Sequence, residues 1–532
     1  MNIASFFRHW SIVDNPFRAE EARHDTVFAK LGVGPAVHPD FDKICGEFDK
    51  PSTSIVFGEK GSGKTAIRLQ IEQRLKEYNA NRSSGKCLFI PYDDLNPMLD
   101  AFYRHSRQKE PGQAFARFCL VDHMDAILHL AVRRLVDGIL DKESELHADL
   151  GDSPQRRLRK GHVELKRDLL LLQACYDKPE TAHDWTQKLA LMVRRRRLLR
   201  PRFFQVVGII LIVLAAAMMI FWSLARSGTA GISAPAGVAW PWLAGGILAA
   251  ILGIASIVKY LRNWWQLRML ASQLAANIRV IDRSRESYLR SLINLRSDDL
   301  LSASLPVNDS DDVRYNMFER LKRVLTEFGF STIMVIVDRV DEPTLVNGSV
   351  PLMRSIIWPM LNSKFLQQDG IGLKLLLPVE LRHELFREST EFFQEARLDK
   401  QNLVERLTWS GATLYDLCNT RLRACSDPSA ATAGKTEASS SSSADSTPVS
   451  SADVSLSNLF TDDVNRQDIV DALDQMQQPR DAFKLLYQCI QEHCSTVTEE
   501  EAAWQIPRLV LENVRRQQAG RVQDLHKGLR PA

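Results

Sequence analysis

One stretch of the sequence decides the fold: Gly58-Glu59-Lys60-Gly61-Ser62-Gly63-Lys64-Thr65. It fits the pattern G-x-x-x-x-G-K-[ST] of the Walker A loop, in which backbone N–H groups surround the phosphates of a nucleotide. We expect all eight residues to bind the nucleotide. Lys64 would reach the β- and γ-phosphates as a catalytic group, and the Thr65 hydroxyl would bind Mg²⁺.

The flanking residues have the form that such a loop requires. Residues 54–57 predict a buried strand, and residues 66–78 predict a helix that buries Ile67, Ile71 and Leu75 on one face. The alternative is a glycine-rich turn that matches by chance. A strand before the loop and a helix after it argue against that alternative.

The composition is that of an ordinary globular protein, since 45% of residues are hydrophobic and 25% are charged. A length of 532 residues leaves room for two to four domains. The net charge of +3 gives no whole-protein attraction to nucleic acid, so we predict no nucleic-acid partner. None of the eight cysteines forms a C-x-x-C pair, which excludes a zinc ribbon or that redox motif. Scattered free cysteines suit a reducing cytosol.

Two apolar stretches in the middle of the chain are long enough to cross a membrane, residues 203–222 and 238–258. Aromatic residues mark their ends, as in the interfacial belts of spanning helices. Neither stretch contains Asp, Glu, Lys, Arg or His, so the pair predicts an anchor rather than an ion path. The alternative is a pair of buried core helices.

Basic residues flank this hairpin and predict its orientation. The hairpin is preceded by six arginines, Arg194 to Arg197, Arg200 and Arg202, and is followed by Lys259, Arg262 and Arg268. The loop between the two apolar stretches, residues 223–237, contains one basic residue, Arg226. The positive-inside rule then places both long arms in the cytoplasm. The arginine run could instead bind DNA or anionic lipid, although a topology signal is the favoured interpretation.

Small residues recur at four-residue spacing in the second apolar stretch, at Gly245, Ala249 and Gly253 and at Gly246 and Ala250. Small residues so placed let helices approach closely. They would pack the hairpin on itself or join neighbouring subunits, and the sequence leaves both open.

A second half of the nucleotide site follows the hairpin. Residues 332–337 predict a buried parallel strand that ends in Asp338, with Asp341 and Glu342 just beyond. We assign Asp338 to Mg²⁺, and either Asp341 or Glu342 to the orientation or deprotonation of the attacking water. The alternative is a strand that ends in a solvated acidic turn.

Two further strands are expected, residues 86–90 and 373–377. The sheet is then assembled from residues on both sides of the hairpin, which requires that both arms lie on the same side of the membrane.

This order of motifs resembles the KAP group of P-loop NTPases, in which a membrane hairpin separates Walker A from the aspartate strand. The cluster Asp338-Arg339-Val340-Asp341-Glu342 looks like the D-x-h-D-E form of the wider STAND and AAA+-like class. Arg339 stands where many AAA+ motors have the catalytic Glu, which leaves the identity of the base and the rate of hydrolysis open. The resemblance implies ATP and Mg²⁺ as cofactors and a multi-pass protein of the bacterial inner membrane, with a role in defence or signalling.

Two arginines are candidate sensors of the γ-phosphate. Pro479 followed by Arg480 and an apolar stripe resembles the start of an AAA+-like lid helix, whose arginine reaches back to the nucleotide. The alternative for Arg480 is an ordinary surface arginine. Arg382 follows the strand 373–377, and for it a surface role is the stronger interpretation.

The expected fold class is α/β, a P-loop NTPase parallel sheet with an inserted two-helix transmembrane hairpin and a C-terminal helical lid. Helices are expected over 115–141, 164–200 and 264–295. The segments are a preamble (1–50), the first NTPase part (51–160), a stalk (161–202), the hairpin (203–258), a second stalk (259–305), the second NTPase part (306–426), a disordered Ser-rich linker (427–456) and the lid with its tail (457–532).

Three classes of function compete. The first is a membrane-anchored ATPase that hydrolyses Mg·ATP slowly, and the second is a nucleotide-gated switch or scaffold with little turnover. A pore opened by assembly is weaker because the spans lack polar lining. A homo-oligomer and an unidentified protein partner are expected in each case.

Overall fold

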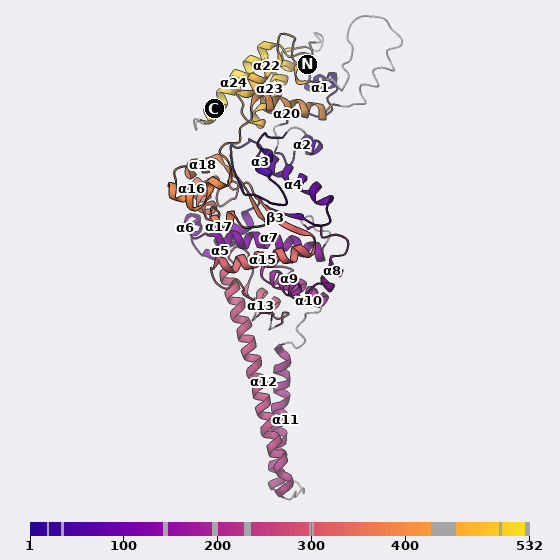
Figure 1. Cartoon of the computed structure of the whole chain (residues 1–532), viewed down its shortest axis with the longest axis vertical. Coiled ribbons are helices and arrows are strands. Elements are labelled where there is room, and N and C mark those ends of the chain that lie inside the picture. The colour runs from indigo at the N-terminus through magenta and orange to yellow at the C-terminus, as the bar shows by residue number, and fades with distance from the viewer. Residues whose placement is uncertain are drawn as a thin grey trace, which may run out of the picture. The chain divides into compact units, whose positions relative to one another are not determined.

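The computed structural model describes residues 1–18, 21–32, 37–141, 147–193, 201–227, 236–296, 299–300, 303–426, 454–498 and 503–526. The chain forms two compact units, whose elements are labelled in Figure 1. The sheet unit comprises Met1–Asp94, Thr332–Arg354 and Leu361–Ala532, and the helical unit comprises Leu95–Ser331 and Ser355–Met360. The arginine run at 194–200 and the loop residues 228–235 lie outside the described residues.

A five-stranded sheet organises the sheet unit, with strand order β2-β3-β4-β1-β5. Strand β1 pairs in parallel with β4 and β5, and β3 pairs in parallel with β4. The strands are β1 Ser54–Gly58, β2 Lys86–Tyr92, β3 Phe330–Val337, β4 Ile371–Pro378 and β5 Asn402–Val404. The α/β class and the four expected strands are confirmed. Strand β5 was not expected, because three residues are too few to give a period.

Apolar residues explain why the central strands form. Every residue of β1 and β4 is buried, and so is every residue of β3 except Ser331. Helix α4 (Lys64–Ala80) lays Ile67, Ile71 and Leu75 on the sheet, in one core with α3 (Phe41–Cys45). The loop 58–65 therefore connects a fully buried strand to a helix that is packed against the same sheet.

Lys374 is the exception within this apolar interior. It lies in the middle of β4, opposite Ser54 of β1, and is fully buried. Its ammonium group donates to the carbonyl of Ser52 at 2.7 Å and to Oγ of Ser54 at 3.2 Å. Burial lowers the pKa of Lys374 to about 8, although the neighbouring thiols of Cys45 and Cys87 oppose the shift.

Helices from the N-terminal and C-terminal parts of the chain pack together in one core of the sheet unit. Phe6, Trp10 and Phe17 share one core with the C-terminal helices, although the preamble 1–50 and the segment 457–532 were expected as separate parts. The helices of this core are α1 Ile3–His9, α2 Thr26–Leu31, α20 Gly411–Ala424, η4 Leu456–Leu459, α22 Arg466–Asp474, α23 Pro479–Thr496 and α24 Arg508–His526. Shorter helices lie between the strands, namely α17 Ser363–Leu366, α18 Val379–Leu385, α19 Thr390–Glu395 and η2 Leu398–Lys400, and α16 Val350–Ile357 is divided between the units.

The Ser-rich stretch 427–456 is only partly described. Residues 427–453 lie outside the described residues. Val454 and Leu456, at its end, are buried in the core of the C-terminal helices. The core of the C-terminal helices therefore includes residues before the expected boundary at 457, because these two apolar side chains pack against α20 and its neighbours.

The helical unit contains α5 Asn96–Ser106, α6 Pro111–Phe115, α7 Leu120–Leu140, α8 Pro154–Lys160, α9 Val163–Tyr176, α10 Ala182–Met192, α11 Pro201–Ser227, α12 Ala236–Asn277, α13 Arg285–Leu292, α15 Asp311–Glu327 and η1 Trp358–Met360. The three long helices expected here were wrong in their continuity. The chain breaks between α6 and α7, between α9 and α10, and between α12 and α13. Pro179 lies in the second break, and proline disfavours a helical residue before it.

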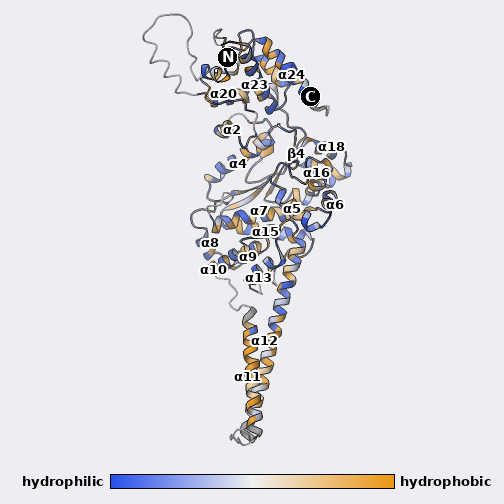
Figure 2. Cartoon of the chain, turned by 180° about the vertical axis from the view of Figure 1, so that it is seen from behind, coloured by the Kyte–Doolittle hydropathy of each residue, from blue (hydrophilic) through white to orange (hydrophobic). Residues whose placement is uncertain are grey.

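Two of the described helices, by length and composition, could cross a membrane: Phe203–Leu224, with mean hydropathy 2.7, and Trp240–Asn277, with mean hydropathy 2.0. Figure 2 shows α11 and the adjoining part of α12 in the hydrophobic colour. Most of the exposed large apolar side chains in the described residues lie on these helices, which does not fit a pair of buried core helices.

Small residues pack α11 against α12. A Cβ built on Gly253 would lie 3.0 Å from the Gly208 carbonyl oxygen, and one built on Gly246 would lie 3.5 Å from that of Ala215. Because 208 faces 253 and 215 faces 246, the two helices run antiparallel. Of the two roles left open for these small residues, the packing of the helical pair on itself is the one seen here.

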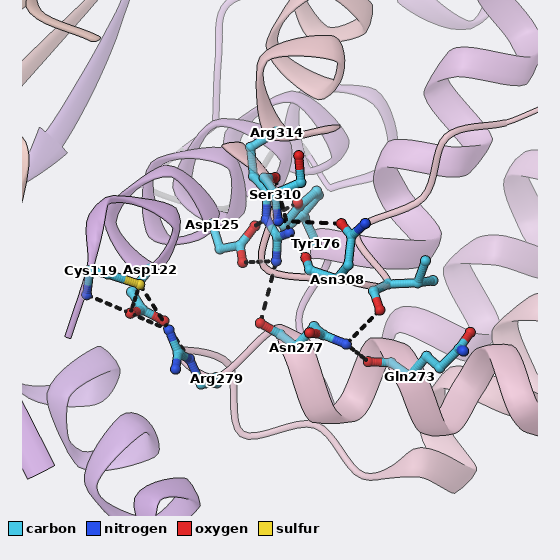
Figure 3. Close-up of polar contacts among 11 residues, drawn as sticks. Cys119, Asp122, Asp125, Tyr176, Gln273, Asn277, Arg279, Asn308, Ser310 and Arg314 are labelled. Carbon is cyan, nitrogen blue, oxygen red and sulfur yellow. Dashed lines mark hydrogen bonds and ion pairs between the residues drawn. The ribbon is translucent and has the colours of Figure 1, made fainter. Parts of the chain in front are cut away.

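The C-terminal end of α12 is held in the helical unit by buried polar contacts (Figure 3). Arg279, just beyond the helix, pairs with Asp122 of α7 at 2.8 Å. Arg314 of α15 pairs with Asp125 of α7 at 3.1 Å, and both side chains are fully buried. The same guanidinium donates to the carbonyl of Asn277 at 3.4 Å. The end of α12 is thus attached to α7 and α15 by groups that burial makes costly to separate.

We predict that Lys374 makes stability depend on pH. Its pKa of about 8 in the folded chain lies below the ordinary value of 10.5, so the unfolded chain binds more protons between those values. The unfolding free energy should therefore rise with pH through this window by up to about 3 kcal/mol, or roughly 5 °C in melting temperature. The melting temperatures of the unmodified protein and of Lys374→Met, each measured at pH 7 and pH 10, test this, because the variant should lack the rise. An equal change of melting temperature with pH in both proteins would refute the prediction.

We also predict that the close approach of α11 and α12 tolerates no side chain at Gly253. Gly253→Leu should destabilise the pair by about 1–3 kcal/mol, because its Cβ alone would lie 2.9 Å from Cγ1 of Ile212. Ala255→Leu is the matched control, since Ala255 is exposed on the same helix. Thermal unfolding of the detergent-solubilised protein measures both, and equal melting temperatures would contradict the expected packing.

Candidate functional site

The loop 58–65 is shaped by two glycines in a conformation that other residues rarely adopt. Gly61 and Gly63 both have φ of +99°, and Gly63 is the residue before the first turn of α4. The loop therefore curls directly into a helix N-terminus, where backbone N–H groups and the helix dipole favour an anion.

The side chain of Lys64, near the end of the loop, reaches back to the first two residues of the loop. Its Nζ donates to the carbonyl of Gly58 at 2.7 Å and to that of Glu59 at 3.0 Å. Burial lowers the pKa of Lys64, and four carboxylates oppose that shift, those of Asp338, Asp341, Glu380 and Glu59. The ammonium group is thus placed among acidic side chains, in a loop that is suited to phosphate.

Thr65 and Asp338 are brought together. The Thr65 hydroxyl donates to Oδ2 of Asp338 at 3.0 Å, and the backbone N–H of Arg339 donates to Oδ1 at 2.9 Å. Asp338 is only 1% exposed, and burial raises its pKa, although Thr65, Lys64 and Arg68 oppose the shift. The aspartate at the end of β3 therefore reaches the first turn of α4, even though β4 separates β3 from β1.

This pair fits a magnesium site that a nucleotide completes. A hydroxyl and a carboxylate are hard oxygen ligands of the kind that Mg²⁺ prefers. Among the described residues, no group of three or more His, Cys, Asp or Glu side chains could hold a metal ion. Since Mg²⁺ in such sites takes its other ligands from phosphates and water, one carboxylate is sufficient.

Ser62 adds an unsatisfied group to the loop. Its residue is fully buried, and its Oγ has no hydrogen-bond partner among the described residues. A buried polar atom without a hydrogen-bond partner costs free energy of folding, so a native structure rarely leaves one without a ligand, water or ion. A bound anion in the loop would provide such a partner.

The two acids beyond Asp338 are not equivalent. Arg339 adopts the left-handed conformation with φ of +62°, and its guanidinium pairs with Glu342 at 2.5 Å and with Glu21 at 3.1 Å. Glu342 is exposed, whereas Asp341 is half-buried and interacts electrostatically with Lys64. Of these two acids, only Asp341 is among the carboxylates that interact electrostatically with Lys64.

The two candidate arginines differ as well. Arg480 follows Pro479 at the start of α23, and its side chain lies on the loop, because a Cβ built on Gly61 would be 3.0 Å from Cβ and Cδ of Arg480. Arg382 instead pairs with Glu405 at 2.8 Å and lies over the ring of Phe386. Arg480 is therefore beside the loop, while Arg382, in α18, contacts the residues that directly follow β5 and α18.

Two of the eight loop residues have side chains that are exposed or that contact residues outside the loop. Lys60 is exposed. Glu59 accepts from Arg406 at 2.5 Å and from the amide of Gln478. Only the backbone of these two positions belongs to the candidate phosphate cradle.

Several contacts of the site could not be found from the sequence. Trp409 donates from Nε1 to the carbonyl of Ser62 at 2.9 Å, and Glu380 interacts with Lys64. Both lie more than 300 positions from the loop. Arg68 pairs at 2.8 Å with Asp93, which directly follows β2.

No protein-family model, no curated protein and no solved structure matches this chain.

Proposed function

We propose that this chain is a membrane-anchored P-loop ATPase that binds Mg·ATP and hydrolyses it slowly. The observation that carries the proposal is the 3.0 Å contact of Thr65 with Asp338, beside a lysine that spans the neck of a glycine-rich loop. A hydroxyl, a buried carboxylate and an ammonium group converge at a helix N-terminus, which is the set of groups that P-loop NTPases use.

Each residue has a defined task in this proposal. The backbone of the loop would hold the phosphates, and Lys64 would exchange its carbonyl partners for phosphate oxygens. Thr65 and Asp338 would hold the magnesium ion, which neutralises charge on the phosphates when bound. Arg480, beside Gly61, would contact the γ-phosphate as the lid approaches.

Asp341 is the favoured base for this reaction. It is half-buried and interacts with Lys64, whereas Glu342 is exposed and paired with Arg339. A general base must lie within reach of the attacking water, and of the two acids only Asp341 interacts electrostatically with the loop lysine.

The anchor in this proposal is the pair α11 and α12, inserted between the loop and Asp338 in the sequence. Strands β1 and β2 precede this pair and β3 to β5 follow it, yet they form one sheet. If α11 and α12 span a membrane, both flanking arms must lie on one side, and the basic flanks assign that side to the cytoplasm. From the resemblance of this order of motifs to that family, we propose a place in the KAP group and in a bacterial inner membrane.

A nucleotide-gated switch with little turnover is the second candidate. The observation that favours it is Arg339, which occupies the position after Asp338 and ties Glu342 in an ion pair. An ATPase that has arginine instead of glutamate directly after the magnesium-binding aspartate would bind ATP but hydrolyse it slowly.

Replacement of the loop lysine tests nucleotide binding. Lys64→Ala should weaken the binding of Mg·ATP at least about tenfold, because a charge-assisted contact to phosphate is lost. Lys76→Ala is the matched control, since Lys76 is exposed on the same helix and pairs only with Glu72 in the described residues. Equilibrium binding of radiolabelled ATP to the purified full chain measures both, and equal affinities would refute the proposed site.

Phosphate release at saturating Mg·ATP separates the two acids. We expect Asp341→Asn to lower the rate by about 100-fold or more and Glu342→Gln by less than about tenfold, since loss of a general base costs that much. ATP affinity, measured in parallel, should change little in either variant. The reverse order would assign the base to Glu342, and negligible release by the unmodified protein that still binds ATP would favour the switch.

A further inference from the structure

Trp409 connects the candidate phosphate loop to the start of α23. It follows β5 in the chain and is buried. Its indole Nε1–H donates to the carbonyl of Ser62 at 2.9 Å, and its backbone N–H donates to the carbonyl of Gln477 at 3.2 Å. One residue thus hydrogen-bonds the loop through its side chain and the lid through its main chain.

The indole has little freedom to move. A Cβ built on Gly63 would lie 3.8 Å from its ring, and His38 packs edge-on against it with ring centroids 5.0 Å apart. Nδ1 of His38 accepts from the N–H of Asp40 at 3.0 Å, so the proton is on Nε2, which donates to the carbonyl of Thr408 at 2.9 Å. The imidazole is therefore fixed as well, and it holds the indole against the loop.

Glu59 makes a second connection between the same two segments. Its carboxylate accepts from Arg406 and from the side-chain amide of Gln478. Gln478 is the N-cap residue of α23 and is buried, yet its side chain makes no capping hydrogen bond to the helix. The amide is directed to the loop instead of to its own helix.

The segment that these contacts hold is the one that carries Arg480. Gln477 has φ of +56°, a left-handed conformation that is uncommon for a residue with a side chain. Such a conformation persists where surrounding contacts maintain it, and here the carbonyl of Gln477 accepts from Trp409. Three residues further on, Arg480 lies against Gly61.

We propose that Trp409 is a positioning residue that couples the phosphate loop to Arg480, so that nucleotide binding in the loop and placement of Arg480 stabilise each other. The inference rests on the proposed binding of Mg·ATP. It goes beyond it by assigning the coupling to the indole N–H, rather than to the apolar packing that any buried tryptophan supplies.

Trp409→Phe removes this N–H and keeps an aromatic ring, and Trp10→Phe is the matched control. Trp10 belongs to the same helical core and also donates its Nε1–H to a backbone carbonyl, that of Trp504 at 3.0 Å. We expect Trp409→Phe to weaken Mg·ATP binding by roughly fivefold, the equivalent of one hydrogen bond, and Trp10→Phe to leave it unchanged at a similar loss of melting temperature. Equal affinities of the two variants would overturn the inference.

A double-mutant cycle with Arg480→Ala tests the coupling itself. If Trp409 acts through the lid, its replacement should change ATP affinity less than about twofold in the Arg480→Ala background, so that the two effects do not add. Additive effects would overturn the coupling. If the unmodified protein binds no Mg·ATP, the proposed function fails, which is a separate outcome from equal affinities of the variants.

Gln478→Leu provides a second test of the coupling between the loop and Arg480 if Trp409→Phe does not fold. It removes the amide that donates to Glu59, leaves the indole in place and loses no helix cap. Gln488→Leu, which removes a half-buried amide of the same helix that hydrogen-bonds Gln517 and Gln518 instead of the loop, is its control. We expect weaker Mg·ATP binding only in Gln478→Leu, again without additivity to Arg480→Ala, and unchanged binding would count against the coupling.

Discussion

The contact between the Thr65 hydroxyl and the Asp338 carboxylate is the interaction on which the candidate site depends. It joins residues 273 positions apart. It exists because β4 pairs in parallel with both β1 and β3, so that the carboxyl ends of these strands meet at one edge of the sheet. A slip of β3 by one residue would turn Asp338 to the other face and remove the site.

Burial of charge is a recurring constraint in both units. In the sheet unit, Asp338 accepts from Thr65 and from the backbone of Arg339, and Lys374 donates to Ser52 and Ser54. Each buried group has at least one partner from a distant part of the chain. Because an unpaired buried charge costs far more than a paired one, these contacts restrict which registers and packings the chain can adopt.

The helical unit uses the same chemistry to hold a long helix. Helix α12 spans 42 residues, with exposed apolar side chains over much of its length and the pairs Arg279–Asp122 and Arg314–Asp125 around its C-terminal end. A single continuous helix therefore links the apolar pair to the buried polar network of Figure 3.

The sequence predicted the elements that depend on local pattern. The glycine spacing of the loop, the apolar runs of β1, β3 and β4, the acidic end of β3 and the two apolar stretches all predicted features that recur in the structure. It also predicted that Pro479 begins a helix, because proline fits the first turn. These patterns are readable since each depends on residues within a few positions of one another.

Tertiary packing determined which distant groups meet. Strand order placed Asp338 beside Thr65, the left-handed Arg339 drew Glu342 into an ion pair, and Trp409 came to lie between the loop and Gln477. Breaks in the long helices and the shared core of the two chain ends were likewise decided there. Such contacts arise from the packing of whole elements, and no local period in a single sequence records which side chains will end as neighbours.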